Sequence, residues 1–222
     1  IESEWWALKE IWKKGLLYEG HKIVPYCPRC GTPLSSHEVA QGYKDVKERS
    51  AVVRFKVKGE DAYILAWTTT PWTLPSNVAL CVNPDEDYVK VTSKGYTYYM
   101  AAALVDTVLG EGAEILEHYQ GKDLEFKEYE PLFPYAEKRI GNKKAYYVVC
   151  DTYVTLTDGT GVVHIAPAFG EDDSKVGHIY DLPFVQLVNE KGEMTEETPW
   201  AGTFCKKADM AVLQALEDKD LQ

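Results

Sequence analysis

The chain has 222 residues, 45% of them hydrophobic and 27% charged, with a formal net charge of −11. This composition is typical of one fair-sized globular domain, and the acidic balance argues against a free-standing, non-specific nucleic-acid binder. No apolar run approaches the ~20 residues that span a bilayer, and no signal peptide is visible, so we expect a cytoplasmic protein without a membrane partner. Five cysteines, two of them in one Cys-x-x-Cys pair, favour a reducing compartment over a disulfide scaffold.

The first predicted element is an amphipathic helix over residues 2–14, with Trp5 and Trp12 on one face. The adjacent pair Trp5 and Trp6 gives this helix more apolar surface than an isolated helix would expose to water. These side chains either pack on the domain's own core or lie at a junction with a larger protein, and we favour the junction. The chain also starts at Ile1, without a methionine, inside this helical pattern. That start suggests a fragment of a longer protein.

Short strands are predicted over 16–18 and 22–26, and a cysteine motif follows them: Cys27-Pro-Arg-Cys30-Gly. Two thiolates two residues apart, turned by Pro and Gly, form one half of a tetrahedral zinc site. His37 is a candidate third ligand, although a surface histidine is the plainer interpretation. We therefore predict a half-site at Cys27 and Cys30 that holds metal weakly or not at all.

The sequence around residue 70 concentrates unusual chemistry between two apolar runs. The predicted strand 63–66 leads into Trp67-Thr-Thr-Thr-Pro-Trp-Thr-Leu-Pro-Ser-Asn77, and a second buried strand is predicted over 78–82. Pro71 and Pro75 fix φ and remove backbone donors, so we expect a stiff loop that continues neither as strand nor as helix. Such a loop presents hydroxyls, an indole and an amide, but no obvious nucleophile. Taken singly, each residue is also ordinary strand or loop material.

The remaining pattern predicts many short strands and few helices. Strands are expected near 52–57, 88–92, 96–100, 145–151, 162–166 and 184–188, and helices over 101–109, 171–180 and 206–217, whereas 111–142 gives no clear pattern. We infer an α+β fold with a β-barrel-like core of short, mostly antiparallel strands and a few peripheral helices.

A second distinctive stretch is Gly159-Thr-Gly-Val-Val-His-Ile-Ala-Pro-Ala-Phe-Gly-Glu-Asp-Asp173. It is not a dinucleotide fingerprint, because His164 stands in place of the third glycine and a strand follows. A lone histidine in an apolar strand is more often a satisfied core group than a functional one. The acidic cluster 171–173 opens a predicted helix, where the helix dipole favours an ionised carboxylate. The chain has no P-loop and no G-x-S-x-G elbow, which argues against a serine hydrolase.

Together the two stretches resemble the editing (CP1) domain of class I aminoacyl-tRNA synthetases, specifically that of the isoleucyl enzymes. The valyl and leucyl relatives carry an Arg before the proline, whereas this chain reads Thr-Thr-Thr-Pro-Trp. The resemblance implies a connecting helix and zinc-knuckle half over 1–40, an editing core over 41–201, and a C-terminal helix over 202–222 that returns toward the parent synthetase. The completing Cys-x-x-Cys of such synthetases lies downstream, so zinc is expected only in the full-length parent, and editing itself needs no cofactor.

The resemblance also implies a reaction, the hydrolysis of valine misattached to the 3′ end of tRNA(Ile), with valyl-adenylate as a second candidate substrate. Asp173 would hold the α-amino group, with Asp172 as the alternative if the register differs by one. Thr69 and Thr70 would orient the attacking water and the carbonyl oxygen, since an activated ester requires no covalent nucleophile. The signature motifs of the ATP-binding catalytic domain are absent from this chain, so amino-acid activation is not expected here.

Other positions would shape the pocket. Thr68, Thr73 and Asn77 would bind substrate or brace the loop, and Trp72 would form an apolar wall. By resemblance, His164 would line the pocket as a steric gate beside a contact to the terminal adenosine. A second, smaller pocket is needed because one methylene is worth only about 1–3 kcal/mol, a limit for which isoleucyl-tRNA synthetases are themselves the standard example.

A second hypothesis assigns no catalytic activity to these residues. The chain would then be a non-catalytic module of knuckle and barrel that binds an RNA end or docks a partner. The charge distribution is relevant to both hypotheses, because residues 1–58 carry a net charge of +4 and the remainder −15. We therefore expect weak binding of tRNA by this chain alone, with the phosphates held by the remainder of the parent synthetase.

Overall fold

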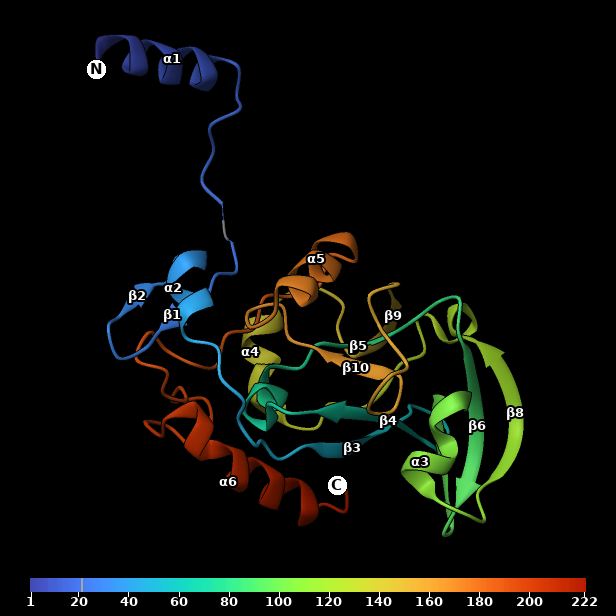
Figure 1. Cartoon of the computed structure of the whole chain (residues 1–222). Coiled ribbons are helices and arrows are strands. Elements are labelled where there is room, and N and C mark those ends of the chain that lie inside the picture. Colours follow the sequence, from blue (N-terminus) through green and yellow to red (C-terminus); the bar gives the residue numbers. More distant parts are fainter. Residues whose placement is uncertain (21) are drawn as a thin grey trace.

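A computed structural model describes residues 1–20 and 22–222, and its body is one curled, mixed sheet with short helices around it (Figure 1). The strands of the sheet are β3 (Ala51–Lys56), β4 (Tyr63–Thr68), β5 (Ala79–Val82), β6 (Asp87–Ser93), β7 (Tyr96–Ala101), β8 (Glu114–Gln120), β9 (Tyr147–Cys150) and β10 (Val162–Ile165). They run in the order β8-β6-β7-β4-β10-β5-β9, and β3 pairs with β4.

The pairing of β4 explains how the sheet curls. β3 pairs with β4 along its whole length, while β7 pairs with the start of β4 through Tyr63 and Ile64, and β10 pairs with its end through Trp67. The pairs β3–β4, β5–β10, β6–β7 and β6–β8 are antiparallel, and β4–β7, β4–β10 and β5–β9 are parallel. The predicted α+β class with a barrel-like, mostly antiparallel core is confirmed.

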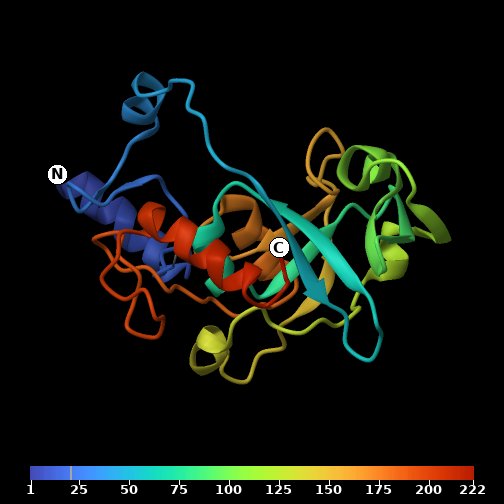
Figure 2. The same ribbon diagram turned by 90° about the horizontal axis from the view of Figure 1, so that it is seen from below.

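Alternation along the strands buries one face of the sheet. In β3, Ala51, Val53 and Phe55 are buried while their neighbours are partly exposed, as expected for a strand with one face in the core. Helix α6 (Cys205–Glu217) packs on this part of the sheet and buries the predicted apolar positions, Ala208, Val212, Leu213 and Leu216. Figure 2 shows α6 lying across the body beside β3 and β4.

The other helices are short. They are α3 (Val105–Leu109), α4 (Glu137–Ile140), α5 (Glu171–Ile179), and the 3₁₀ turns η1 (Pro71–Ser76), η2 (Ala102–Leu104), η3 (Gly121–Leu124) and η4 (Pro134–Ala136). The predicted helices 2–14 and 101–109 are each followed by a glycine, Gly15 and Gly110, and both glycines have the positive φ that ends a helix. Within the described residues, no helix combines the length and apolarity needed to cross a bilayer.

The N-terminal arm is separate from this body. Helix α1 (Glu2–Lys13) stands away from the sheet at the end of an extended segment (Figure 1) and contains no buried residue. Trp5 and Trp12 are each 68% exposed, so the alternative in which they pack on the domain's own core is wrong for this structure. A small hairpin of β1 (Tyr26–Cys27) and β2 (Thr32–Pro33) follows, and then α2 (Ser36–Gln41).

Two local predictions are wrong, and one strand lies where the sequence gave no pattern. Residues 16–18 and 22–25 form no strand, because this part of the arm has no neighbouring strand to pair with, and only Tyr26–Cys27 is extended and paired. β8 lies in the stretch that gave no pattern, since both of its faces are largely exposed and only pairing with β6 holds it. The predicted strand 184–188 is an irregular buried segment with one bridge, Val188 to Met194.

Candidate functional site

The threonine-rich segment connects β4 to β5 at one end of the sheet. The prolines do not prevent helix formation here, contrary to the prediction, because residues 71–76 form the 3₁₀ helix η1. Pro71 occupies its first position, where no backbone N–H is needed and the fixed φ already matches a helix. The result is the expected stiff connection, but built as a helical turn.

Strand β10 brings His164 to this turn. β10 lies between β4 and β5, in register with Val163 opposite Trp67 and His164 opposite Leu80. The imidazole Nε2 of His164 lies 3.0 Å from the hydroxyl of Thr73, across 91 residues of sequence. The two distinctive stretches of the sequence therefore meet at a direct hydrogen bond.

The hydrogen-bond pattern assigns the proton on this histidine. The single hydroxyl proton of Thr73 is donated to the carbonyl oxygen of Thr70 at 2.8 Å, because a carbonyl can only accept. Nε2 of His164 must then carry a proton and donate it to Thr73, which leaves Nδ1 as a bare acceptor. Complete burial lowers the pKa of His164 to about 4, so the ring is neutral at physiological pH.

Asp173 lies in the first turn of α5, nine residues after His164 in the chain. Its Oδ2 accepts a hydrogen bond from the backbone N–H of Ala166 at 3.1 Å, which ties α5 to the end of β10. Gly170 makes room for this carboxylate, since a Cβ there would lie 2.8 Å from Asp173 Cγ. Among the described residues no lysine or arginine forms an ion pair with Asp173.

Burial sets the pKa of Asp173. Its position in the first helical turn favours the ionised form, whereas burial raises the pKa to about 6. The hydrogen bond from Ala166 opposes this rise without cancelling it. Asp173 is therefore largely ionised at pH 7, and no cation in the described part of the chain pairs with it. Asp172, the alternative, is exposed and pairs with Lys175 at 3.0 Å.

Several buried polar atoms around this junction lack a partner in the described residues. They include Trp72 Nε1, Ser76 Oγ and His164 Nδ1. Buried polar groups are nearly always hydrogen-bonded, so orphans gathered at one place require an explanation. A bound ligand or water that supplies donors to His164 and an acceptor to Trp72 would satisfy them. Trp72 thus offers a donor as well as the apolar wall expected from the sequence.

The threonines divide into two groups by their hydrogen bonds. Thr68 Oγ1 accepts from the backbone N–H of Thr70 at 3.0 Å, and Thr73 is engaged by Thr70 and His164. Thr70 Oγ1 has only hydroxyl neighbours at 3.4 Å, beyond normal O–H···O length, and Thr69 has no hydrogen bond within the described chain. The hydroxyls of Thr69 and Thr70 are therefore the uncommitted ones.

Asn77 lies beneath the turn rather than on its surface. It is buried, its amide nitrogen donates to the carbonyl oxygen of Ala79 at 2.8 Å, and its Oδ1 accepts from the Tyr129 hydroxyl at 2.7 Å. Of its two predicted roles, binding substrate or bracing the loop, this geometry favours bracing.

Sequence reasoning missed two neighbours of Trp72. The ring of Phe169 packs edge-on to the Trp72 indole at 5.0 Å between centroids, and the carboxylate of Asp209 on α6 accepts a hydrogen bond from the Trp72 backbone N–H at 2.9 Å. Phe169 stood within the second distinctive stretch but carried no polar signal. Asp209 gave none at all, because it is one acidic residue on an amphipathic helix 137 residues away.

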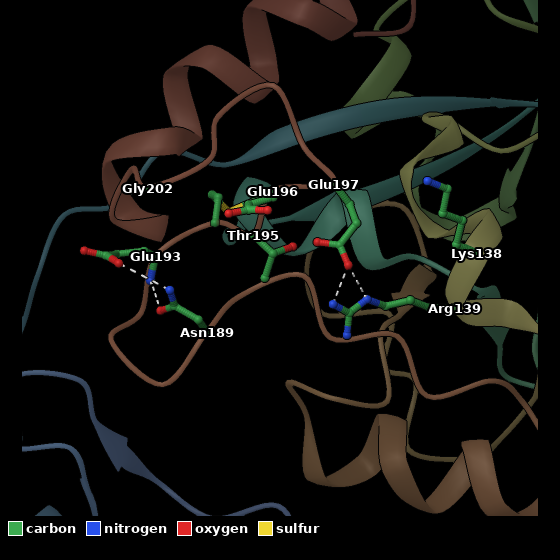
Figure 3. Close-up of a pocket in the computed structure, with 9 residues that line it drawn as sticks. Lys138, Arg139, Asn189, Glu193, Thr195, Glu196, Glu197 and Gly202 are labelled. Atoms are coloured by element: carbon green, nitrogen blue, oxygen red, sulfur yellow. Dashed lines mark hydrogen bonds and ion pairs between the residues drawn. The ribbon is translucent and has the colours of Figure 1, made fainter.

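Two cavities of the structure are lined by residues other than those predicted for the site. One of about 810 Å³ lies between α4 and the segment 189–202, where Arg139 and Glu197 form an ion pair across it (Figure 3). Its lining residue Met194 belongs to the same apolar cluster as Trp72. A smaller cavity of about 200 Å³ borders the outer face of α5. Neither is lined by Thr69, Thr70, His164 or Asp173.

The cysteine pair forms a tight turn in the arm. The Sγ of Cys27 accepts from the backbone N–H of Cys30 at 3.4 Å, and this bond lowers the pKa of Cys27 while the neighbouring sulfur raises that of Cys30. His37 lies nearby in sequence but pairs with Gln41. Among the described residues no group of three metal-ligating side chains exists. The pair suits half of a tetrahedral zinc site, and its occupancy stays a prediction.

Comparison with known families places this geometry in context. The family model for class I tRNA synthetases (I, L, M and V) matches residues 1–200. The isoleucine–tRNA ligase of Clostridium acetobutylicum is 59% identical over 220 residues, and that of Picrophilus torridus is 46% identical over 222. These matches cover 98% and 100% of this chain but 21% of each ligase, so the chain spans about a fifth of the length of these relatives.

Solved structures agree on the fold. A crystal structure described as GlLeuRS-CP1 superposes with a TM-score of 0.63 at 14% identity, covering 78% of this chain and 97% of that one. The editing domain of the Plasmodium knowlesi cytosolic leucyl-tRNA synthetase gives a TM-score of 0.59 at 13% identity, covering 82% and 97%. At these identities the likeness concerns the fold alone.

Proposed function

Because this chain belongs to the class I tRNA synthetases for isoleucine, leucine, methionine and valine, we propose that it is the proofreading domain of an isoleucyl-tRNA synthetase. Its substrate is valine esterified to the 3′ end of tRNA(Ile), and hydrolysis of the ester by water releases free valine and free tRNA. Valyl-adenylate is a second substrate of the same pocket. The ligase relatives support the isoleucyl assignment, and the fold shared with editing domains supports the reaction class.

One observation carries this proposal: the 3.0 Å contact between His164 Nε2 and the hydroxyl of Thr73. It joins the threonine-rich turn to the segment that leads into Asp173, so hydroxyls, a neutral imidazole and one unpaired carboxylate surround the same end of the sheet. Such a set binds an aminoacyl ester by its ammonium group and its oxygens. It contains no residue poised as a covalent nucleophile.

Asp173 is the anchor in this mechanism. Its unpaired carboxylate binds the α-ammonium group of the valyl ester through a charge-assisted hydrogen bond, which holds the ester carbonyl in a fixed place. The hydroxyls of Thr69 and Thr70, free of strong hydrogen bonds, orient the attacking water and the carbonyl oxygen as negative charge develops there. Thr68, Thr73 and Asn77 hold the turn that presents them.

His164 acts by shape and by accepting a hydrogen bond, not as a general base. A group with a pKa of about 4 binds a proton too weakly to take one from water at neutral pH. The buried ring instead limits the space for the amino-acid side chain, together with Trp72 and its neighbour Phe169. Isoleucine is excluded by overlap, which discriminates more steeply than the loss of one favourable contact.

The parent synthetase supplies what this chain lacks. It holds the tRNA phosphates, since the chain carries a net charge of −11, and it supplies two further ligands that complete a zinc site with Cys27 and Cys30. The reaction takes place in the cytoplasm, with no cofactor in the editing pocket. Metal analysis of the isolated chain tests the zinc proposal, because one tightly bound zinc per chain would contradict a half-site.

Deacylation assays test the function. Val-tRNA(Ile) and Ile-tRNA(Ile) are incubated with the chain at high concentration, and in parallel with a full-length relative such as the Clostridium acetobutylicum ligase. We expect both proteins to release valine faster than isoleucine, and the chain to need far higher concentration. If neither ester is cleaved above background by either protein, the alternative of a non-catalytic RNA-end or partner-binding module holds.

A further inference from the structure

The first turn of η1 poses a capping problem. At the start of a helix the backbone N–H groups have no partner within the helix, and a Thr at the N-cap normally accepts one of them with its side chain. Pro71 has no N–H, and the N–H of Thr73 is bonded to the Thr70 carbonyl at 3.0 Å. The N–H of Trp72 is therefore the one donor in this turn that needs an acceptor.

Thr70 is the N-cap residue, yet its hydroxyl does not cap the turn. The acceptor is Asp209 on α6, whose Oδ1 lies 2.9 Å from the Trp72 nitrogen. The Asp209 side chain is only 20% exposed, and burial raises its pKa, opposed by the bond from Trp72. A carboxylate at this place also suits the positive end of a helical turn. A residue from another element thus supplies the cap.

Because Asp209 accepts the hydrogen bond from the Trp72 N–H, the Thr70 hydroxyl does not have to cap the turn. The backbone N–H of Thr70 donates to Thr68 Oγ1, and its carbonyl accepts from Thr73 twice, so the residue is held firmly by its main chain. Its Oγ1 has only the two hydroxyl contacts at 3.4 Å. The side chain that would ordinarily bind the Trp72 N–H remains available.

We propose that Asp209 is a positioning residue that takes over the capping of η1, so that the Thr70 hydroxyl stays directed to the ester and its attacking water. The proposal rests on the proposed function, because it assigns a reason for Thr70 to be free. It also links α6 to the pocket: displacement of α6 returns Thr70 to its local capping role and withdraws it from the substrate. A purely structural Asp209 would only anchor α6, and its loss would act independently of Thr70.

A double-mutant cycle separates these roles. Asp209→Ala, Thr70→Val and the double variant are compared with the unchanged chain in Val-tRNA(Ile) deacylation, with Glu217→Ala, an exposed change on the same helix, as control. We expect Asp209→Ala to lower kcat about ten- to hundredfold with KM nearly unchanged, since misplacing a positioned group costs that much. In the Thr70→Val background the same change should cost less than about twofold, and Asp209→Asn, which keeps an acceptor oxygen, should restore most of the rate.

Hydrogen exchange at the Trp72 amide provides a readout that does not depend on activity. We expect protection in Asp209→Ala, because Thr70 takes over the cap, and loss of protection in the double variant, where no cap remains. If Asp209→Ala does not fold, Asp209→Ser, which is too short to reach the turn, replaces it in the cycle.

The outcomes distinguish this proposal from the proposed function. Equal rate losses from Asp209→Ala with and without the Thr70 hydroxyl, or Trp72 protection lost equally in both backgrounds, would overturn the positioning role while leaving editing intact. An unchanged rate in Thr70→Val would do the same. Absence of deacylation by both the unchanged chain and the full-length relative would overturn the proposed function. Hydrogen exchange at the Trp72 amide would still show which residue caps η1.

Discussion

The two walls of the candidate site are built on different principles. The threonine turn, 68–77, satisfies most of its polar groups internally and with Asp209, and it has no titratable side chain. The segment 164–173 carries two titratable groups, His164 and Asp173, whose pKa values burial shifts in opposite directions, beside the exposed carboxylates of Glu171 and Asp172. Burial disfavours a charged imidazole and a charged carboxylate alike.

The difference shows how a site can hold a single charge. At pH 7 the imidazole of His164 is neutral and the carboxylate of Asp173 is ionised, so these two groups give the proposed pocket a single negative charge. Below pH about 6 the carboxylate gains a proton, and the pocket becomes neutral until His164 is protonated near pH 4. The threonine turn thus determines the shape and hydrogen bonding of the proposed site, and the segment 164–173 determines its charge.

The largest effect is expected when the anion is removed. Asp173→Asn keeps the size of the side chain but leaves the substrate ammonium group unpaired, which costs about 2–5 kcal/mol for a buried pair. Clearance of Val-tRNA(Ile) should therefore fall by roughly 30-fold to several thousandfold, as measured by single-turnover deacylation. Asp172→Asn is the matched control, since that neighbour is exposed and paired with Lys175, and it should leave the rate nearly unchanged. The reverse result would shift the anchor to Asp172.

A smaller effect should follow from pH alone. As pH falls from 7 to 5 through the Asp173 pKa of about 6, the anion is progressively lost and kcat/KM should fall about tenfold. His164 should contribute no inflection in this range, because its own pKa is about 4. A profile of kcat/KM between pH 5 and 8 tests both statements. A fall at high pH would report loss of the substrate's own α-ammonium charge, whose pKa is about 8. An acid-side inflection near pH 6 that persists in Asp173→Asn would contradict the neutral-imidazole assignment.

The shape of the pocket should depend on His164. His164→Ala removes bulk beside the Thr73 hydroxyl and should raise the ratio of isoleucine to valine release by on the order of tenfold, the scale of one methylene. Parallel deacylation of Ile-tRNA(Ile) and Val-tRNA(Ile) measures this ratio. His164→Gln, which retains volume and a donor toward Thr73, serves as control and should preserve selectivity. An unchanged ratio in the alanine variant would remove the gating role.

The smallest effect concerns stability rather than activity. The folded-state pKa of Asp173, about 6, lies above the ordinary value of 3.8, so its ionised form destabilises the fold at pH 7. Asp173→Asn should therefore raise the free energy of unfolding by about 1–3 kcal/mol above pH 6, and this gain should vanish as pH falls to 4. Urea unfolding at pH 7 and pH 4 measures it.

His164 affects the pH dependence of stability in the opposite direction, which makes the same experiment more informative. Its folded-state pKa lies below the ordinary value of 6.5, so stability from the neutral ring is complete above that pH and is lost as pH falls toward 4. In the unchanged chain the two effects offset each other. In Asp173→Asn the histidine effect should appear alone, as stability that declines on acidification. A variant less stable than the unchanged chain at pH 7 would show that the Asp173 carboxylate is not destabilised by burial.

Patterns within single segments predicted much of this molecule. The alternation in β3 and the apolar face of α6 follow from local sequence, and the structure bears out both elements, whereas the stiff loop expected at Pro71 is a 3₁₀ helix. The resemblance between both distinctive stretches and the synthetases identified the family from residues 67–77 and 159–173. The observed contact between Thr73 and His164 then gave that resemblance a geometry.

The features that sequence could not predict depend on contacts between distant segments. β8 has too little apolar alternation to be recognised and exists because β6 offers an edge to pair with. The pKa of Asp173 is raised by burial among surrounding elements, whereas the sequence revealed only its position at the start of a helix. Asp209 belongs to the site through one hydrogen bond that no local pattern marks.

The exposed helix α1 has a practical consequence for spectroscopy. Three of the six tryptophans of the chain, Trp5, Trp6 and Trp12, lie on it at about two-thirds exposure, and the other three lie in the body. Half of the indole emission should thus arise from water-exposed rings and stay red-shifted whether or not the sheet is folded. Unfolding monitored by tryptophan fluorescence would report only on the three tryptophans of the body. Binding of any surface that covers α1 would shift the emission of Trp5, Trp6 and Trp12 to shorter wavelength.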